Sequence, residues 1–526
     1  MKILISDHLS EKGIDILKNT PGFEVDIETS LTHEELRHVI KDYDALVIRS
    51  ATKVTSDIIE AAEKLKVIGR AGIGLDNVDI IAASKRGIVV MNTPEGNVIT
   101  TAEHTIALLM AMSRNIPQAV ASMKAGKWEK KKFRGKEVFN KTLGIIGIGR
   151  IGRIVAERAK GLKMQVIAYD PYISGDLIEK LGVEPVSFDE LLERSDYISV
   201  HTPLTNETRD LINAEAFKKM KKGVMVLNCA RGGIINEQDL YQAIKEGIVA
   251  RAALDVFVTE PPVDNPLLEL EEVIATPHLG ASTEEAQENV AVAVAEQIVD
   301  YLVKGTIRNA VNVPAVDAET LANLKPNLIL AEKLGSLLTQ ITRGAVKEIS
   351  IEYIGETATY DTDPITVSLI KGVLTPFMGH QVNFVNAPIL AKERQIKITE
   401  SKRQEAEDFT NLISVYMKTT ESENLVAGTI FGKKDPRLVR INDFRMEAAL
   451  EGHLLLIFNI DTPGTIGSIG TCLGKHRINI SMMDVGQVIE KGQNIILLRT
   501  DTPVPDEVRD ELLSLENVNI VLKLEL

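Results

Sequence analysis

The segment "TLGIIGIGRIG", residues 142–152, decides the expected fold. It is a short β-rich run, 142–146, that leads into a helical pattern. Gly147 and Gly149 lie between the two, and Gly152 lies within the helical pattern. The G-x-G-x-x-G spacing at a strand-to-helix turn is typical of a dinucleotide site, where glycines let the backbone approach a pyrophosphate at the helix N-terminus. Such a motif usually opens a nucleotide-binding domain. Here it begins only at residue 142, so the preceding chain needs its own explanation.

The preceding residues 1–98 alternate β-rich runs with helical stretches, the runs being 2–6, 23–27, 45–49, 66–70 and 88–92. Strands that alternate with helices predict a parallel sheet covered on both faces, so this part is an α/β unit of its own. A helix is expected at 101–115, and Pro117 favours a second one directly after it. From the glycine motif to about residue 280 the strand–helix alternation continues and predicts a second doubly wound sheet.

A long helical pattern follows and ends at Gly305. Ser282 and Glu285 have the spacing of a capping box at its start. This helix and the one at 101–115 would carry the chain out of the first unit and back into it. We therefore expect a nucleotide domain inserted in a discontinuous first domain, with a cleft between them that can close.

The chain changes character after residue 312. Residues 312–321 read as a linker, and the stretch up to about 450 mixes helices with β-rich pieces such as 347–355 and 423–432. The last part, 451–526, has the order β-α-β-β-α-β of a ferredoxin-like fold.

The composition excludes several classes of protein. A net charge of -14 argues against nucleic acid as the main ligand. No apolar run approaches the ~18 residues of a membrane span, and the N-terminus, with Asp7 and no long apolar core, does not resemble a secretory signal. Cys229 and Cys472 lie far apart and lack metal-ligand spacing, so we expect a cytoplasmic, reduced protein with no bound metal.

Asp170 ends the strand pattern after the glycine motif, 18 residues beyond Gly152. A carboxylate at this place accepts hydrogen bonds from a ribose 2′-hydroxyl and repels a 2′-phosphate, which favours NAD over NADP. The alternative is a structural glycine turn, with Asp170 an exposed residue at a strand end.

Three further polar residues, Arg231, Glu260 and His278, lie at or just beyond strand ends, where ligand sites of open α/β sheets form. A histidine beside a carboxylate suits general acid–base chemistry, and an arginine can grip a substrate carboxylate with two hydrogen bonds. Each of the three can also be an ordinary loop residue, but their combination with a dinucleotide motif favours catalysis.

The segments "HTPLTNETRDLI", "NCARGGIINEQDL", "ALDVFVTEPP" and "ATPHLGASTEEAQENVA", together with the glycine motif, resemble the D-isomer-specific 2-hydroxyacid dehydrogenase family. "RSATKVT", "VIGRAGIGLDNVD" and "NTPEGNVITTAEH" are similar to its 3-phosphoglycerate dehydrogenase branch. The resemblance covers essentially the whole chain and implies an α/β protein with these units: 1–98 and 283–312 for substrate, 99–282 for NAD, 313–450 as an intervening α+β domain, and 451–526 as an ACT regulatory domain.

The resemblance also implies roles for individual residues. His278 would be the acid–base, Glu260 its partner and Arg231 the clamp on the substrate carboxylate and carbonyl. The residues implied to contact NAD are Ile73, Gly147, Gly149, Arg150, Ile151, Gly152, Asp170, Thr202, Cys229, Ala230, Arg231, Asp255, His278, Leu279, Gly280 and Ala281. Those implied on the substrate side are Arg49, Ser50, Asn97 and Gln287.

A phosphate dianion in a closing cleft needs a cation or an array of N–H donors, and Arg49 and Ser50, just after a strand, suit both. Arg70 is a further candidate. The basic run 130–134 is interpreted as a solvated loop, with a phosphate contact from a neighbouring subunit as the alternative. In the ACT region, Asp461, Gly464 and Asn479 are candidates to hold an amino acid, with L-serine as the economical effector. The alternative there is a dimerisation sheet without a ligand.

The leading hypothesis is NAD-dependent oxidation of 3-phospho-D-glycerate to 3-phosphohydroxypyruvate, the first committed step of serine synthesis, in a homo-oligomer, expected to be a tetramer. A reductase for hydroxypyruvate, glyoxylate or 2-oxoglutarate stays open as an alternative within the family. An NAD-sensing binding protein on the same fold is the alternative from another class. Arg49 and the ACT region argue against a pure glyoxylate enzyme. The NAD-sensing proteins that resemble this fold are transcriptional corepressors, and they lack an ACT domain.

Overall fold

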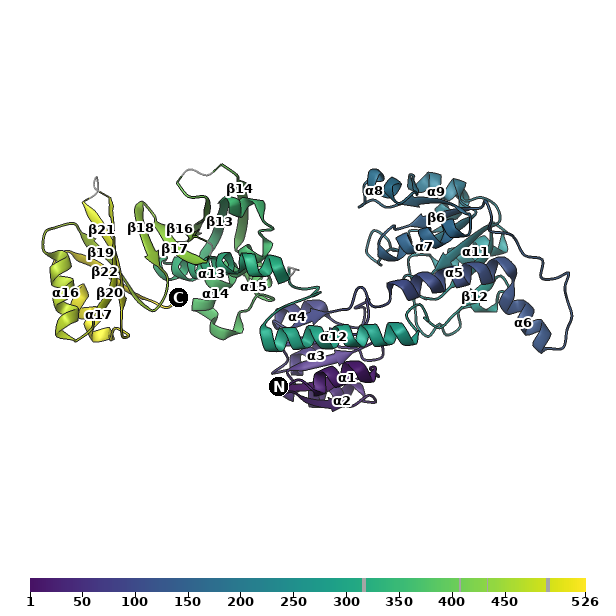
Figure 1. Ribbon diagram of the computed structural model, residues 1–526, viewed down its shortest axis with the longest axis horizontal. Helices are drawn as coiled ribbons and strands as arrows, with labels where there is room; N and C mark the ends of the chain where they lie inside the picture. Colours follow the sequence, from purple (N-terminus) through teal and green to yellow (C-terminus); the bar gives the residue numbers. More distant parts are fainter. Residues whose placement is uncertain (315–317, 406–407, 433, 489–491) are drawn as a thin grey trace.

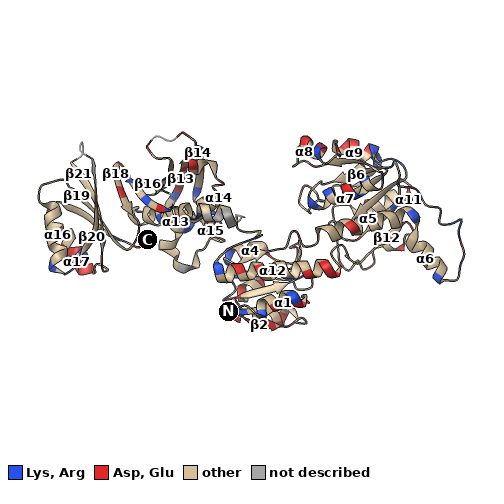
Figure 2. Cartoon of the chain, in the orientation of Figure 1, with Lys and Arg blue, Asp and Glu red and all other residues tan. Residues whose placement is uncertain are grey.

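The computed structural model describes residues 1–314, 318–405, 408–432, 434–488 and 492–526, which form four β-sheets (Figure 1). The sheets lie in a row along an elongated molecule, with the C-terminal sheet at one end and the sheet of the glycine motif at the other. Lys and Arg are interspersed with Asp and Glu along the row (Figure 2). Within the described ranges, none of the helices combines the length and the apolar character that a membrane crossing requires.

The first sheet is parallel throughout, with the strand order β2-β1-β3-β4-β5. Successive strand residues face opposite sides, so Leu4 packs toward α2, α3 and α4, whereas Ile3 and Ile5 pack toward α1 and α12. Both faces are thus covered, as predicted. The bounds are β1 Lys2–Ile5, β2 Glu24–Ile27, β3 Ala45–Ile48, β4 Val67–Arg70, β5 Val89–Met91, α1 Glu11–Lys18, α2 His33–Val39, α3 Ser56–Ala61, α4 Ile80–Lys85 and α12 Glu284–Lys304.

Helix α12 packs against α1 and β4 of this first unit, as expected for a helix that returns the chain to it. The helix ends at Gly305, in the left-handed conformation (φ 69°), as predicted. The predicted capping box of Ser282 and Glu285 is wrong, because Thr283 caps the helix and its Oγ1 accepts the N–H of Ala286 at 3.2 Å. The N–H of Ser282 instead donates to the carbonyl of Leu279 and closes the preceding turn, so the helix begins one residue later.

The second sheet is also parallel and has the order β12-β11-β10-β9-β6-β7-β8. The strand order reverses at β6, between β7 and β9, and ligands of such sheets bind outside the carboxyl ends at this point. The bounds are β6 Thr142–Ile146, β7 Gln165–Tyr169, β8 Glu184–Pro185, β9 Tyr197–Val200, β10 Val224–Asn228, β11 Val249–Leu254, β12 Val273–Ala275, α5 Val98–Arg114, α6 Ile116–Lys124, α7 Arg150–Gly161, α8 Gly175–Lys180, α9 Phe188–Arg194, α10 Ala214–Lys219 and α11 Glu237–Lys245.

The third sheet is mixed and has the order β14-β13-β15-β16-β17-β18, with α13 and α14 packed together beside it. The predicted linker 312–321 is partly wrong, since α13 already begins at Ala318 in the helix-forming run "AETLANL"; residues 315–317 lie outside the described residues. The bounds are α13 Ala318–Ile341, α14 Asp363–Met378, α15 Ala387–Glu393, β13 Val346–Gly355, β14 Lys397–Arg403, β15 Asn411–Thr419, β16 Glu423–Phe431, β17 Asp435–Ile441 and β18 Phe444–Ala449.

The fourth sheet is antiparallel and has the order β20-β21-β19-β22. With one helix after its first strand and one after its third, it has the predicted ferredoxin-like order. The bounds are β19 His453–Ile460, α16 Thr465–Lys475, β20 Ile480–Val488, β21 Gln493–Thr500, α17 Asp506–Leu513 and β22 Val518–Leu524.

Candidate active site

The glycine motif forms the turn between β6 and α7 at the reversal of the second sheet. Gly147 has a φ of 91°, and a Cβ there would lie 2.8 Å from the carbonyl oxygen of His201. Around Gly149, apart from its chain neighbours and its own helix, no described atom lies within 4 Å of the place that a Cβ would take. The first glycine therefore permits the tight turn, and the second leaves an open face at the helix N-terminus for a phosphate group.

The carboxylate of Asp170, at the end of β7, lies beside this turn. Its Oδ2 accepts the N–H of Ile148 at 3.0 Å, and its Oδ1 accepts the N–H of Tyr172 at 2.9 Å. Each oxygen keeps a further lone pair for a hydroxyl donor. Arg150, exposed at the start of α7, donates to the carbonyl of Pro94 at 3.4 Å and so reaches the loop that enters α5.

Most other residues implied for the cofactor follow the carboxyl ends of β9 to β12: Thr202, Cys229, Ala230, Asp255 and the run from His278 to Ala281. Ile73 lies on the first unit, where its carbonyl accepts from Asn92 at 2.6 Å. The hydroxyl of Thr202 is buried without a hydrogen-bond partner among the described residues. Together with the open face at Gly149, this unpaired hydroxyl means that the residues present fit a dinucleotide.

Cys229 follows β10 and is buried and unpaired. Burial raises the pKa of its thiol to about 12. The thiol therefore stays protonated near neutral pH and is a packing group at the edge of the site, not a nucleophile.

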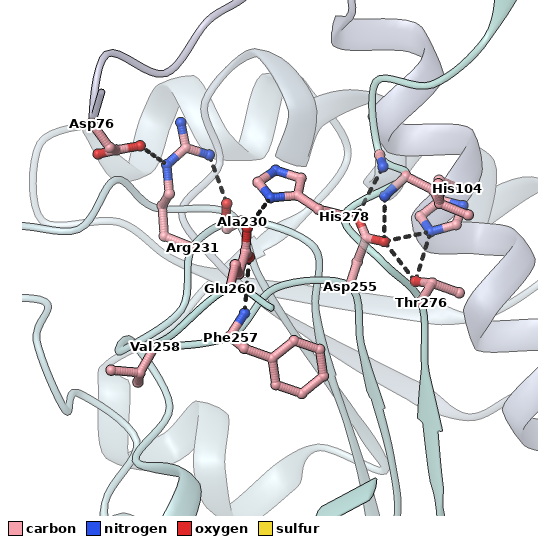
Figure 3. A network of polar contacts seen from close by, with 12 residues as sticks. Asp76, His104, Ala230, Arg231, Asp255, Phe257, Val258, Glu260, Thr276 and His278 are labelled. Atoms are coloured by element: carbon pink, nitrogen blue, oxygen red, sulfur yellow. Dashed lines mark hydrogen bonds and ion pairs between the residues drawn. The ribbon is translucent and has the colours of Figure 1, made fainter. Parts of the chain in front are cut away.

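His278 and Glu260 form a hydrogen-bonded pair in the loops that follow β12 and β11 (Figure 3). Nδ1 of His278 lies 2.8 Å from Oε2 of Glu260, and Oε1 of Glu260 accepts the N–H of Phe257 at 3.1 Å. The hydrogen bond to Glu260 raises the pKa of His278. Burial opposes the ionisation of Glu260, but the hydrogen bonds from His278 and Phe257 outweigh it and lower its pKa. With Nδ1 engaged, Nε2 is the ring atom left to exchange a proton with a ligand.

Arg231, just after β10, bridges the two α/β units (Figure 3). Its Nε donates to Oδ2 of Asp76 at 3.0 Å, and its Nη1 donates to the carbonyl of Ala230 at 2.7 Å. The side chain of Asp76 is 75% exposed, so this contact can exchange for another carboxylate. The guanidinium therefore already holds a carboxylate at the place where the sequence predicts a substrate clamp.

Two further arginines of the first unit, Arg49 and Arg70, lie within electrostatic range of Arg231. Nε of Arg70 donates to Oδ1 of Asn77 at 3.0 Å, and Nδ2 of Asn77 donates to the carbonyl of Arg49 at 2.7 Å. Burial, together with the positive charges of Arg231 and Arg49, lowers the pKa of Arg70 to about 10. Arg70 still carries its charge at neutral pH. Three guanidinium groups therefore act on one another here, with the carboxylates of Asp76 and Asp7 also in range, and this excess of cations suits a dianion.

The remaining candidates on the substrate side lie after β3 and at the starts of α5 and α12. Ser50 is exposed after Arg49, and Gln287 is exposed in the first turn of α12. Asn97 is the N-cap residue of α5, and its Oδ1 is buried with no partner in the described chain. The basic run 130–134 belongs to an exposed loop after α6, where Lys132 pairs with Glu271 at 3.2 Å.

Sequence reasoning gave His104 no role and did not connect it with Asp255. Oδ1 of Asp255 lies 3.2 Å from Nε2 of His104 and accepts the hydroxyl of Thr276 at 2.6 Å (Figure 3). Burial opposes the ionisation of Asp255, but the hydrogen bonds from His104 and Thr276 and from the N–H of Leu279 lower its pKa. The signal in the sequence is weak, since His104 is one of several polar residues in the helical run "TAEHTIALLM".

The candidate regulatory residues do not come together within one chain. Gly464, with a φ of 98°, caps α16, and Oδ1 of Asp461 nearby accepts from Asn494 at 2.8 Å. Asn479 precedes β20, and its N–H donates to Asp501 at 3.1 Å. Strands β19 and β20 run in the same direction on either side of β21, so Asp461 and Asn479 lie at opposite ends of that strand. Asp461 pairs with Gly492 and Asn479 with Asp501, so about nine residues of strand, or roughly 30 Å, separate the two side chains.

Comparison with known proteins gives matches along the whole chain. Residues 106–280 match the NAD-binding domain of the D-isomer-specific 2-hydroxyacid dehydrogenases, residues 323–442 match the D-3-phosphoglycerate dehydrogenase intervening domain, and residues 453–517 match the ACT domain. The chain is 46% identical to the D-3-phosphoglycerate dehydrogenase of Methanocaldococcus jannaschii over 100% of both chains. It is 42% identical to that of Bacillus subtilis over 100% of this chain and 99% of the relative.

A similar solved structure is the D-lactate dehydrogenase of Aquifex aeolicus complexed with NAD and lactic acid. It aligns with a TM-score of 0.54 and 28% identity, and the match covers 60% of this chain and 100% of that one.

Proposed function

This chain belongs to the D-3-phosphoglycerate dehydrogenase family, and we propose that it oxidises 3-phospho-D-glycerate to 3-phosphohydroxypyruvate with NAD. The observation that carries the proposal is the His278–Glu260 pair, held at 2.8 Å beside Arg231 at the carboxyl edge of the NAD-binding sheet. This is the first committed step of L-serine synthesis.

The residues divide the chemistry between them. When bound, NAD accepts the hydride that leaves C2 of the substrate. His278 takes the hydroxyl proton at Nε2, and Glu260 stabilises the imidazolium that results. Arg231 exchanges the carboxylate of Asp76 for that of the substrate and holds it with charged hydrogen bonds. Arg49 and Ser50 bind the phosphate group, with Asn97 and Gln287 lining the same gap.

Turnover by the purified full-length chain tests this function. We expect oxidation of 3-phospho-D-glycerate with NAD and much weaker activity with NADP, because Asp170 repels a 2′-phosphate. An enzyme that reduces hydroxypyruvate, glyoxylate or 2-oxoglutarate but leaves phosphoglycerate untouched would replace the proposal with the reductase alternative. NAD binding without turnover of any 2-hydroxy acid would favour a sensor.

Arg49 provides the test of the substrate. Arg49→Ala should raise KM for 3-phospho-D-glycerate by about 10²-fold or more, since it removes a charged partner of the phosphate. Unphosphorylated 2-hydroxy acids should be affected far less. Ser50→Ala is the milder companion variant, and an equal loss with both kinds of substrate would mean damage to the cleft rather than loss of a phosphate contact.

We also propose a homotetramer whose ACT domains bind L-serine as a feedback inhibitor. Antiparallel pairing of two such sheets about a twofold axis would join the Asp461 end of one chain to the Asn479 end of the next. Exposed apolar side chains of α6 and the following loop support association: Ile116, Val120, Met123, Trp128 and Phe139. Calorimetric titration of the full-length protein with L-serine at millimolar concentration tests the effector, and sedimentation tests the assembly.

The division into 1–98 with 283–312, 99–282, 313–450 and 451–526 stays part of the proposal. It is supported by the four sheets, each of which lies within one of these units. We further propose a cytoplasmic location, supported by two cysteines, Cys229 and Cys472, that are unpaired and separately buried. Limited proteolysis tests the unit boundaries, and fractionation of the source cells tests the location.

A further inference from the structure

The buried carboxylate of Asp255 organises the backbone that carries His278. Its main-chain oxygen accepts the N–H of His278 at 3.0 Å. Its Oδ1 accepts the N–H of Leu279 at 2.7 Å, and its Oδ2 accepts the N–H of Gly280 at 2.8 Å. Three successive amide groups therefore converge on one residue, whose side chain is only 1% exposed.

This arrangement holds a backbone that is otherwise unfavourable. His278 has a φ of 55°, in the left-handed region that a residue with a Cβ seldom adopts. Such a residue persists only when its surroundings fix the conformation. The contacts to Asp255 act on His278 itself and on the two residues after it, so they set the direction in which the imidazole leaves the chain.

Helix α5 in turn fixes Asp255 and the loop (Figure 3). Nε2 of His104 lies 3.2 Å from Oδ1 of Asp255 and 3.3 Å from Oγ1 of Thr276. An ionised carboxylate can only accept hydrogen bonds, so Nε2 carries the proton and donates it. One turn earlier on α5, the hydroxyl of Thr101 donates to the carbonyl of Gly280 at 3.0 Å. Gly280 is thus held at its N–H by Asp255 and at its carbonyl by Thr101.

We propose that His104 is a positioning residue, which acts through Asp255 to aim His278 at Glu260 and at the substrate. The proposal rests on the proposed function, and it gives His104 no contact with substrate or cofactor. If His104 merely filled space beneath the loop, an apolar residue of similar size would replace it. If it positions the loop, a replacement must also donate a hydrogen bond at the place of Nε2.

Two substitutions separate these cases. His104→Leu removes the donor and puts an apolar side chain of similar size in its place. His104→Gln keeps an N–H donor close to the position of Nε2. Ser113→Ala is a matched control on the same helix, since its hydroxyl contacts Tyr197 at 3.0 Å, away from the loop. We expect His104→Leu to lower kcat about tenfold with KM values nearly unchanged, because a misaimed base costs rate more than binding. His104→Gln and Ser113→Ala should stay within about twofold of the original enzyme.

A second readout does not need turnover. Carbethoxylation of histidines, followed by peptide mass spectrometry as a function of pH, reports the pKa of each imidazole. The midpoint for His278 should move to lower pH in His104→Leu and stay in place in His104→Gln, with His33 in the same digest as an unaffected reference. Equal kcat and equal midpoints in the Leu variant and the original enzyme would overturn the proposal, as would equal damage in the Leu and Gln variants. If the original enzyme failed to oxidise phosphoglycerate, the function would fall, and the midpoints would still decide the role of His104.

Discussion

Two histidine–carboxylate pairs lie at the carboxyl edge of the NAD-binding sheet, where Asp255 and Glu260 are close in sequence, and the two pairs differ in exposure. In the His278–Glu260 pair the side chains are 49% and 38% exposed, and in the His104–Asp255 pair they are 19% and 1% exposed. The exposed pair can meet a ligand and exchange a proton with it. The hydrogen bonds of the buried pair go to protein groups of the loop after β12.

The hydrogen-bond partners sharpen the difference. Glu260 accepts from His278 and from one backbone N–H. Asp255 accepts from His104 and from three further donors, the Thr276 hydroxyl and the N–H groups of Leu279 and Gly280. The charge of Glu260 therefore acts mainly on the pKa of one imidazole, whereas the charge of Asp255 is shared among donors that define a loop. The same two residue types thus serve proton transfer in one place and backbone geometry in the other.

The strongest test of this contrast is the loss of the exposed histidine. His278→Ala should lower kcat by about 10²–10⁴-fold, the range for loss of a general base. NAD should still bind, because the glycine turn and Asp170 lie on other strands of the sheet. Steady-state kinetics and a fluorescence titration with NAD measure the two quantities. An unchanged kcat would mean that another group takes the proton.

Removal of the charge from Glu260 should change the pH dependence as well as the rate. Glu260→Gln keeps the shape of the side chain but loses the carboxylate that raises the pKa of His278. Oxidation needs the neutral imidazole, so activity rises with pH through the pKa of His278, and this rise should move to lower pH in the variant. Reduction needs the imidazolium, and its decline with rising pH should also begin earlier. We expect kcat of oxidation to fall about 10–10²-fold, and a pH profile that does not move would break the pairing.

The corresponding change in the buried pair should affect stability together with rate. Asp255→Asn places an amide N–H₂ opposite donors that need acceptors, and the loss of charged hydrogen bonds there costs about 1.5–3 kcal/mol. The melting temperature of the NAD-binding part should fall by several degrees, and kcat by about tenfold. The pKa of Asp255 is lowered in the folded state, so its contribution is present above the ordinary carboxyl range and is lost as pH falls through the lowered pKa. Calorimetry at neutral and acidic pH should therefore show the gap between the two proteins closing in acid. A gap that stayed constant would contradict this assignment.

The sequence predicted the fold well because periodicity and turn chemistry are local. The strand runs of both α/β units, the return helix that ends at Gly305 and the ferredoxin-like order are all confirmed. The errors concern choices that depend on neighbours. Ser282 is used by the turn that precedes α12, so Thr283 caps the helix instead.

The candidate site was only half accessible from the sequence. Motifs identified Arg231, Glu260 and His278, but some of the side chains that hydrogen-bond to Arg231 and to Asp255 come from distant parts of the chain. Asp76 and His104 lie 155 and 151 residues from their partners, and nothing local marks those contacts. In the ACT region, the strand-to-helix turn and the resemblance to ACT domains suggested a site for Asp461 and Asn479 between paired domains. Strand direction separates the two residues in a single chain.

The smallest effect is expected from a third pair, His33 and Asp57. It tests whether a short histidine–carboxylate distance is by itself enough to affect catalysis. Nε2 of His33 lies 2.8 Å from Asp57, the same distance as in the His278–Glu260 pair, and both side chains are similarly exposed. Hydrogen bonds from Thr55 and from His33 lower the pKa of Asp57 to about 2. This pair joins the first turns of α2 and α3, and neither residue is among those implied to hold the substrate or the cofactor. His33→Ala should therefore leave kcat and its pH profile unchanged and shift the melting temperature by less than about 2 °C, as for most exposed ion pairs. A clear loss of activity in His33→Ala would show that contact geometry matters more than location at the carboxyl edge, and the distinction between the first two pairs would then need another basis.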